Sequence, residues 1–197
     1  PERLEELPEN VCGVFNDDFG GAYQGTEYLL SRGCRRPVFL ELEIADRVYR
    51  ERSEGFLHAL NDHGLRGRSM LVKNRLAIPS DERLQFYREC AVRLLAQLAD
   101  CDGFFTCNDP MAAALQGVLE ERKLALPVLG YDDYSEFGRP RLDTVAVDYE
   151  RIGGGAVRQL RLTDLPRFHK ILPRLKVGRV GRSDEFPDME IRELKYS

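Results

Sequence analysis

The stretch DGFFTCNDPMAAALQGVLEERKLALPVLGYDD, residues 102–133, contains two short apolar runs separated by a segment of helical length. The runs FFT and VLG are short and uninterrupted, which is typical of strands that are covered on both faces. Between them, Asp109 is suited to the N-cap of a helix and Pro110 to its first position, and we expect this helix to continue to about Lys123. A strand, a helix and a second strand in this order predict a right-handed crossover between parallel strands.

The same alternation extends in both directions from this stretch. Strands are predicted at 11–15, 37–42, 70–72 and 144–147, and helices at 20–32, 48–63, 80–98 and 152–160. In the helix that begins at Ser80, the apolar stripe is predicted to consist of Leu84, Tyr87, Val92, Leu95 and Leu98. Residues 171–180 alternate apolar and basic side chains, as an edge or crossing strand would, and residues 189–191 allow at most one short strand. The pattern predicts an α/β fold with a doubly wound, mostly parallel sheet and Rossmann-like subdomains.

Composition excludes several classes of protein. The chain has 197 residues, of which 43% are hydrophobic, and this is enough apolar material for a packed core. Its net charge of −4 produces no general positive field for nucleic acid, and no apolar run is long enough to span a membrane. No G-x-G-x-x-G, Walker or G-x-S-x-G motif follows a predicted strand, so we expect no enzyme. The alternative that Asp132 and Asp133 perform acid–base chemistry or hold Mg²⁺ remains open.

The cysteines and histidines predict neither a metal site nor a disulfide framework. The chain has 5 cysteines, none in a C-x-x-C pair, and 3 scattered histidines. Reduced, mostly buried thiols in the cytosol are the simplest interpretation. We therefore expect no metal and no cofactor.

Polar side chains follow the predicted strands at one edge of the sheet. In doubly wound sheets, ligands bind beyond the carboxyl ends of the strands. The Asn and Asp residues at these positions are Asn16, Asp17, Asp18, Asn108, Asp109, Asp132, Asp133 and Asp148. Their oxygens and amides can orient hydrogen bonds to a polyhydroxylated ligand. The same residue types also favour loops and helix caps, and this alternative remains open for each of them.

Read in order, these segments resemble the effector-binding domain of the LacI/GalR family of bacterial transcriptional regulators. Besides residues 102–133, the matching segments are NDDFGGAYQGTEYLLSRGCRRPVFL (16–40), RVYRERSEGFLHALNDHGL (47–65), PRLDTVAVDYERIGGGAV (140–157) and ILPRLKVGR (171–179). They stand in the family's order and cover about residues 14–182. Several motifs in register make a more specific signal than any one motif such as GYDD.

The resemblance implies a fold of the type I periplasmic binding protein class, in which two α/β subdomains enclose a ligand cleft. It assigns residues 19–147 to the C-terminal subdomain. Residues 1–18 and 148–174 would be fragments of the N-terminal subdomain, and residues 175–197 a crossing strand and tail. The DNA-binding domain that family members carry would be absent from this chain.

The resemblance also implies a set of ligand-binding residues. The arginine of the R-x-x-G-F motif falls on Arg52, the asparagine of N-D-x-M-A on Asn108, and the aspartate of the GYDD loop on Asp132. The first loop supplies Asp17, which is the preferred candidate, and Asp18. Candidates of second rank are Asn16, Asp148 and Tyr149.

Two departures from the family pattern are visible. Val147 stands where family members often place a polar ligand contact, which indicates a different ligand pose. Cys34 replaces the histidine of the usual Gly-His-Arg turn, and we interpret it as a structural residue.

The function implied is ligand sensing in a cytoplasmic regulator. A sugar or similar small polar effector would bind in the cleft and modulate the binding of operator DNA by a homodimer, with no role for a membrane. The alternative is a periplasmic sugar-binding receptor of a transporter, which shares the fold.

Overall fold

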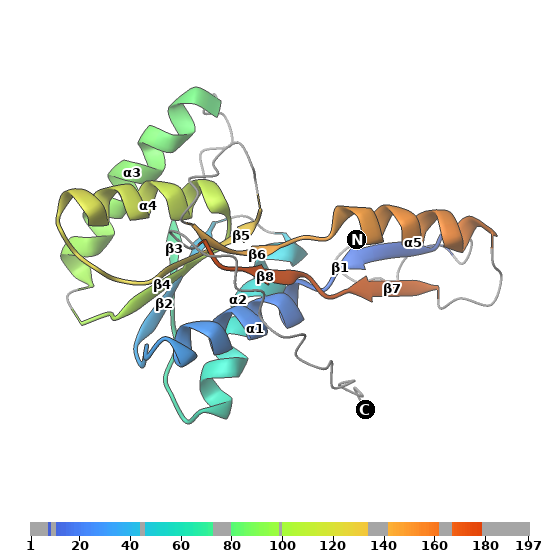
Figure 1. Cartoon of the computed structure of the whole chain (residues 1–197), viewed down its shortest axis with the longest axis horizontal. Coiled ribbons are helices and arrows are strands. Elements are labelled where there is room, and N and C mark those ends of the chain that lie inside the picture. The colour runs from blue at the N-terminus through green and yellow to red at the C-terminus, as the bar shows by residue number, and fades with distance from the viewer. Residues whose placement is uncertain are drawn as a thin grey trace.

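The computed structural model describes residues 8, 11–43, 46–72, 80–98, 100–133, 142–161 and 167–178. Strands and helices alternate along the chain, except that β6 follows β5 and β8 follows β7 (Figure 1). In chain order they are β1 (Gly13–Asn16), α1 (Asp18–Ser31), β2 (Pro37–Leu42), α2 (Arg47–Asp62), β3 (Arg68–Val72), α3 (Ser80–Gln97), β4 (Gly103–Thr106), α4 (Asp109–Glu121), β5 (Val128–Asp132), β6 (Asp143–Ala146), α5 (Tyr149–Arg161), β7 (Phe168–Ile171) and β8 (Arg174–Lys176).

The larger sheet is six-stranded, in the order β3-β2-β4-β5-β6-β8. All its pairings are parallel except that of β8 with β6, which is antiparallel. Helices α1 and α2 cover one face and α3 and α4 the other (Figure 1). This arrangement buries the strands on both sides, which explains why they read as continuous apolar runs such as PVFLEL.

The core of this sheet is rich in aromatic rings. Phe39 lies 5.4 Å from Phe56 and 5.4 Å from Phe105, centroid to centroid. Phe105 in turn stacks on Tyr131 at 6.3 Å. All four side chains are fully buried. The row of rings therefore extends from the centre of the sheet to Tyr131, near the carboxyl end of β5.

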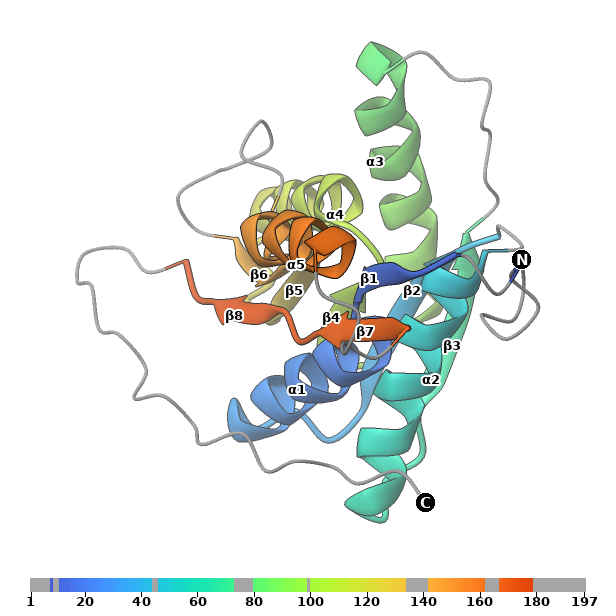
Figure 2. The same ribbon diagram turned by 90° about the vertical axis from the view of Figure 1, so that its right-hand side faces the viewer.

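The smaller sheet is the parallel pair β1 and β7, against which α5 packs (Figure 2). It extends to one side of the larger sheet (Figure 1). The chain passes between the two sheets where β1 leads into α1, where β6 leads into α5, and where β7 leads into β8. The first of these passages carries the polar residues Asn16, Asp17 and Asp18.

The α/β fold class and the predicted order of elements from β1 through α5 are confirmed, whereas β7 (Phe168–Ile171) was not predicted and several details are corrected. The N-cap of α4 is Asn108, whereas Asp109 is the first helical residue. Strand β5 continues through Asp132, so Tyr131 and Asp132 belong to the strand and not to its exit loop. The segment 171–180 is not one strand: within its described part, β7 ends at Ile171 and β8 begins at Arg174. The short strand considered at 189–191 lies outside the described residues.

The apolar stripe of α3 also differs from the prediction. Tyr87 and Leu98 are buried, but Leu84 is 41% exposed and Val92 is 39% exposed. The buried position between them is Ala91. Leu95 is partly buried against the core as predicted, so the core-facing side of α3 differs from the prediction in having Ala91 in place of Val92 and Leu84.

No described helix is long and apolar enough to cross a bilayer. Within the same residues, no group of His, Cys, Asp or Glu side chains is arranged to hold a metal ion. Cys34 is buried, and burial raises the pKa of its thiol to about 11. This environment fits the structural role that the sequence predicts for it.

Candidate functional site

Arg52 lies at the centre of a polar cluster at the carboxyl ends of the strands. Its Nε donates to Asp18 Oδ1 at 2.8 Å, and its Nη2 donates to Asp132 Oδ1 at 2.8 Å. Its Nη1 donates to the carbonyl oxygen of Cys107 at 2.6 Å. The guanidinium thus joins α2 to the start of α1, to the turn after β4 and to the end of β5. Three segments that are distant in the sequence meet on one side chain.

Aromatic and amide groups complete the cluster. The guanidinium carbon of Arg52 lies 3.7 Å from the centroid of the Tyr131 ring, which is a close cation–π contact. Asn16 donates from Nδ2 to Asp18 Oδ1 at 2.9 Å and to the Tyr131 hydroxyl at 3.2 Å. The Oδ1 atom of Asn16 is buried, and none of the described residues forms a hydrogen bond to it. Because β1 carries Asn16, these bonds connect the smaller sheet to the larger one.

Burial and charge act in opposite directions on these groups. Burial alone would lower the pKa of Arg52, but the carboxylates of Asp132 and Asp18 outweigh it and raise that pKa, so the guanidinium stays charged. Burial raises the pKa of Asp18 above its ordinary value, and the nearby charge of Arg52 opposes this rise. Burial also raises the pKa of Tyr131 well above 10, so its hydroxyl stays neutral. At neutral pH, Arg52 is a cation that already has anionic partners.

Local backbone geometry directs the two carboxylates. Asp18 is the first residue of α1, and the preceding Asp17 is the N-cap, accepting from the Gly20 N–H at 3.1 Å. Asp132 has φ 102° and Asp133 has φ 61°, values in the left-handed region that few non-glycine residues adopt. This turn of the chain brings the Asp132 carboxylate to Arg52, while Asp133 forms an ion pair with Lys176.

The structure brings only some of the predicted site residues together. Asp18, Arg52, Asp132 and the second-rank candidate Asn16 form the cluster. The carboxylate of Asp17, the preferred candidate, instead caps α1.

The remaining candidates have local partners. Asn108 is buried, and its Oδ1 accepts from the Met111 N–H at 3.0 Å. Asp148 accepts from the Arg151 N–H at 3.0 Å and forms an ion pair with Arg174 at 3.4 Å. Tyr149 is 62% exposed at the start of α5. None of these contacts tests ligand binding, so their assignment stays a prediction.

Two members of the cluster escape sequence reasoning. Cys107 contributes a backbone carbonyl, which any residue possesses, so no side-chain pattern could indicate it. Tyr131 stands beside Asp132 in the motif GYDD, but its apolar ring reads as part of the buried strand. The signal that could have drawn attention to it is its phenolic hydroxyl, because a buried tyrosine hydroxyl usually has a polar partner.

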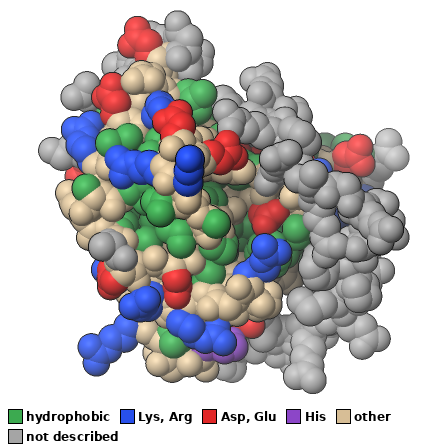
Figure 3. Space-filling view, turned by 60° about the vertical axis from the view of Figure 1, so that its left-hand side comes forward, with side chains coloured by type: hydrophobic (Ala, Val, Ile, Leu, Met, Phe, Trp, Pro, Cys, Tyr) green, Lys and Arg blue, Asp and Glu red, His purple; other side chains and the backbone are tan. Residues whose placement is uncertain are grey.

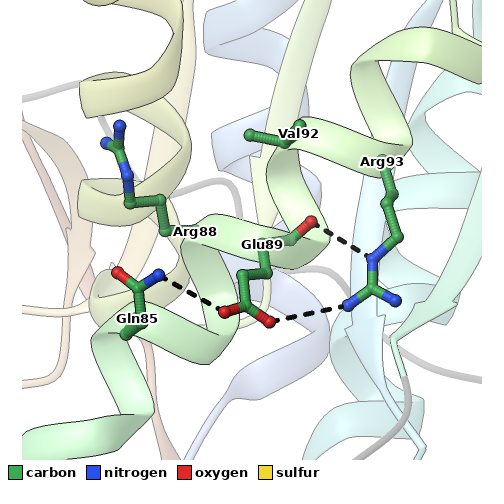
Figure 4. Close-up of a pocket in the computed structure, with 5 residues that line it drawn as sticks. All are labelled: Gln85, Arg88, Glu89, Val92 and Arg93. Carbon is green, nitrogen blue, oxygen red and sulfur yellow. Dashed lines mark hydrogen bonds and ion pairs between the residues drawn. The ribbon is translucent and has the colours of Figure 1, made fainter.

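Two surface hollows lie away from this cluster. One, of about 420 Å³, lies along α3, where Gln85 and Arg93 both contact Glu89 (Figure 4). Arg88, which also lines it, reaches across to Glu121 of α4. The polar groups of this hollow thus have partners on α3 and α4. The other, of about 500 Å³, lies between α5 and the β1–β7 pair.

Comparison with known proteins identifies the fold family. The model of the periplasmic binding protein-like domain matches residues 26–174. The chain belongs to this family. It is 31% identical over 153 residues to the HTH-type transcriptional repressor PurR of Pasteurella multocida, an alignment that covers 75% of this chain and 44% of the repressor. The repressor of the same name from Haemophilus influenzae (strain PittEE) is 32% identical over 157 residues, covering 77% and 45%.

Solved structures agree with this assignment. A LacI family transcriptional regulator from Silicibacter pomeroyi superposes with a TM-score of 0.70 at 26% identity, covering 87% of this chain and 65% of that one. The transcription regulator GntR from Chromobacterium violaceum gives a TM-score of 0.71 at 27% identity, covering 87% and 66%. The chain consists of LacI/GalR-type effector-binding domain sequence. It spans about two thirds of the length of these two solved chains and somewhat less than half the length of the two curated repressors.

Proposed function

We propose that the cluster around Arg52 binds a small, uncharged, polyhydroxylated effector, with a sugar as the preferred class, and that binding alters operator recognition by the regulator. The observation that carries this proposal is the guanidinium of Arg52, held by Asp18 and Asp132 at the carboxyl edge of the sheet. Side chains held in this way present fixed acceptors and donors, which a ligand with several hydroxyl groups can satisfy without reorganising the site.

The charges of the cluster favour an uncharged ligand over an anionic one. The guanidinium of Arg52 already forms ion pairs with two acidic side chains, those of Asp18 and Asp132. A phosphate or carboxylate placed here would meet Asp18 and Asp132 as well as the arginine. A hydroxyl group donates to a carboxylate and accepts from a guanidinium, so it suits both.

Sugar complexes among more distant structural relatives support the ligand class. Regulators of this fold have been solved with D-xylulofuranose, with ribose and with cellobiose. Their identities to this chain are 18%, 22% and 23%, so they support the class of ligand and not a particular sugar.

The bonds between the sheets give effector binding a route to the rest of the regulator. Asn16, on β1, bonds to Asp18 and Tyr131, which belong to the larger-sheet unit. An effector that contacts Asp18 and Asp132 either replaces the bonds that Asn16 makes or adds bonds beside them. In either case its binding favours one arrangement of the two sheets over the other. Such coupling is typically worth about 1–3 kcal/mol. We infer that this difference is transmitted to a DNA-binding domain of the longer protein.

A homodimer is part of the same proposal. Apolar side chains gather in the middle of the face that Figure 3 shows, with charged side chains around them. Large apolar side chains remain exposed on α3 and just after α4, where Val92 is 39% and Leu124 is 46% exposed. Exposed apolar patches of this kind mark protein interfaces. Sedimentation of the full-length regulator is expected to give twice the mass of one chain, and the mass of one chain would contradict the dimer.

The experiment that tests the effector proposal is calorimetric titration of the full-length regulator with a panel of sugars, each paired with its phosphate ester. At least one sugar is expected to bind, and to bind more tightly than its ester. Asp132→Asn removes a charged acceptor and is expected to weaken this binding by about tenfold or more. Asp100→Asn is the matched control, because Asp100 is exposed and pairs with Arg68 away from the cluster. Binding that survives both Asp132→Asn and Arg52→Lys unchanged would contradict the site.

A further inference from the structure

A further buried carboxylate, that of Asp109, lies near the cluster and bonds to a residue outside it. Asp109, the first residue of α4, is 2% exposed, and its Oδ1 accepts from the Thr144 hydroxyl at 2.6 Å. Thr144 is 4% exposed and lies on β6. Hydroxyl-to-carboxylate bonds of this length are strong, and a buried carboxylate is costly without donors. The Asp109–Thr144 bond therefore fixes the start of α4 to β6.

Gly130 lies under this bond. It is the neighbour of Thr144 in the β5–β6 ladder. A side chain at position 130 would collide with Oδ1 of Asp109, so the backbone of β5 lies directly against the carboxylate. The hydroxyl of Thr106 adds a bond to the Asn108 carbonyl at 2.8 Å and contacts the Leu129 carbonyl at 3.3 Å. The turn between β4 and α4, together with the first residue of α4, is thus bonded to β5 at Leu129 and to β6 at Thr144.

Gly130, the residue of β5 held against Asp109, lies two residues before Asp132. A strand rises about 3.3 Å per residue, so Gly130 is only about 7 Å from Asp132 along β5. In the same ladder, Asp132 pairs with Ala146, two residues after Thr144. The turn fixed by Thr106 also contains Cys107, whose carbonyl accepts from Arg52. Two of the three protein partners of the guanidinium are therefore placed by this arrangement.

We infer that Asp109 and Thr144 are positioning residues, which hold β5 against α4 so that Asp132 meets Arg52 in a single geometry. This role rests on the proposed function only in that an effector would contact Asp132. The residues act through the backbone of Gly130 and do not touch a ligand. Without the bond between them, the end of β5 shifts relative to α4, and the bond from Arg52 Nη2 to Asp132 is the first to weaken. The bond from Arg52 Nε to Asp18 belongs to α1 and is expected to persist.

The test is nuclear magnetic resonance of the guanidinium of Arg52 in the arginine-¹⁵N-labelled 197-residue chain, without any ligand. The Arg52 signals are assigned by their disappearance in Arg52→Lys. In the unmodified protein, bonds to three partners are expected to give separate, slowly exchanging Nη resonances. In Thr144→Val, the hydrogens on Nη2 are expected to exchange about tenfold faster, while the Nε hydrogen changes little. Thr144→Ser, which restores the hydroxyl, is expected to restore the slow exchange.

The matched control is Thr26→Val. Thr26 is fully buried in α1, and its hydroxyl donates to the Ala22 carbonyl at 2.7 Å, so the change removes a comparable buried bond. This variant is expected to lose thermal stability but to keep the Arg52 signals of the unmodified protein. Equal Nη exchange in Thr144→Val and Thr26→Val would overturn the positioning role, as would rapid Nη exchange in the unmodified protein. Neither result depends on an effector, so failure here is distinct from failure of the titration.

Discussion

Replacing Arg52 with methionine should cost the domain a large part of its stability. The side chains of Arg52, Asp18 and Asp132 are only 6%, 5% and 14% exposed. Methionine keeps much of the apolar stem of arginine but leaves both carboxylates without their cation. Removing one partner from a buried ion pair typically costs about 3–5 kcal/mol, out of a total stability of about 5–15 kcal/mol. We expect a loss in the free energy of unfolding of about 3–5 kcal/mol near pH 7.

The loss should depend on pH with a definite sign. Burial raises the folded-state pKa of Asp18 above its ordinary value, and the charge of Arg52 opposes that rise. A carboxyl group with a raised folded-state pKa contributes stability at low pH, which is lost as the pH rises through that pKa. Without Arg52 the pKa of Asp18 rises further, so the variant loses more stability than the unmodified protein on going from acid to neutral pH. The deficit is therefore expected to be smaller near pH 5 than near pH 7.

Urea unfolding followed by far-ultraviolet circular dichroism measures this deficit, since the chain has no tryptophan to report by fluorescence. The matched control is Arg47→Met on the same helix, where Arg47 is 19% exposed and forms an i,i+4 pair with Glu51. Such pairs contribute less than about 1 kcal/mol, so this variant should change little at either pH. A deficit for Arg52→Met below about 1 kcal/mol, or one equal at both pH values, would refute the reasoning.

Two further predictions concern glycines and thiols. Gly130→Ala should lower the free energy of unfolding by about 1–3 kcal/mol in the same urea assay, because the added methyl group collides with Asp109. In the control Gly153→Ala, on α5, the methyl group meets open space and should raise the free energy of unfolding by about 0.5–1 kcal/mol. Equal effects of the two changes would contradict the packing at Gly130. Full burial raises the pKa of the Cys107 thiol to about 12. Iodoacetamide should therefore alkylate the exposed Cys12 in the native protein and Cys107 only after unfolding, which mass spectrometry of the peptides measures. Labelling of Cys107 in the native protein would contradict its burial.

The order of strands and helices follows from the hydrophobic pattern of the sequence. Each strand of the larger sheet that is buried on both faces has an uninterrupted apolar run, which distinguishes it from the helices. Strand β2 coincides with the predicted 37–42, and α1 begins two residues before the predicted 20. Where two neighbouring residues are equally suited to cap a helix, hydrophobic periodicity does not determine which of them is the N-cap. Asn108 and Asp109 are both good caps, and the extended backbone of Asn108, with φ −158° and ψ 163°, makes it the N-cap. Asp109, the first helical residue, accepts a hydrogen bond from Thr144.

The candidate site was predictable as a set of residue types and not as a set of contacts. Asp17, Asp18 and Asn16 are adjacent and chemically similar, so the ranking that placed Asp17 first could not rest on their chemistry. The structure separates them by their partners, since Asp17 bonds to the Gly20 N–H and Asp18 reaches Arg52. The same local competition engages Asn108 at the start of α4. The first N–H groups of a helix need acceptors, and the residue with non-helical backbone torsions just before the helix supplies one from its side chain.

The sequence by itself determined the alternation of strands and helices, and with it the edge of the sheet at which polar loops gather, because both depend on local periodicity and on the rule for parallel strands. Only the tertiary structure decided that Arg52 meets Asp18, the Cys107 carbonyl and Asp132, which are 34, 55 and 80 residues away in the chain. That meeting depends on strand order, on the left-handed backbone at Asp132 and on the packing of Gly130 against Asp109. These are relations between distant segments, and no local pattern of residues carries them.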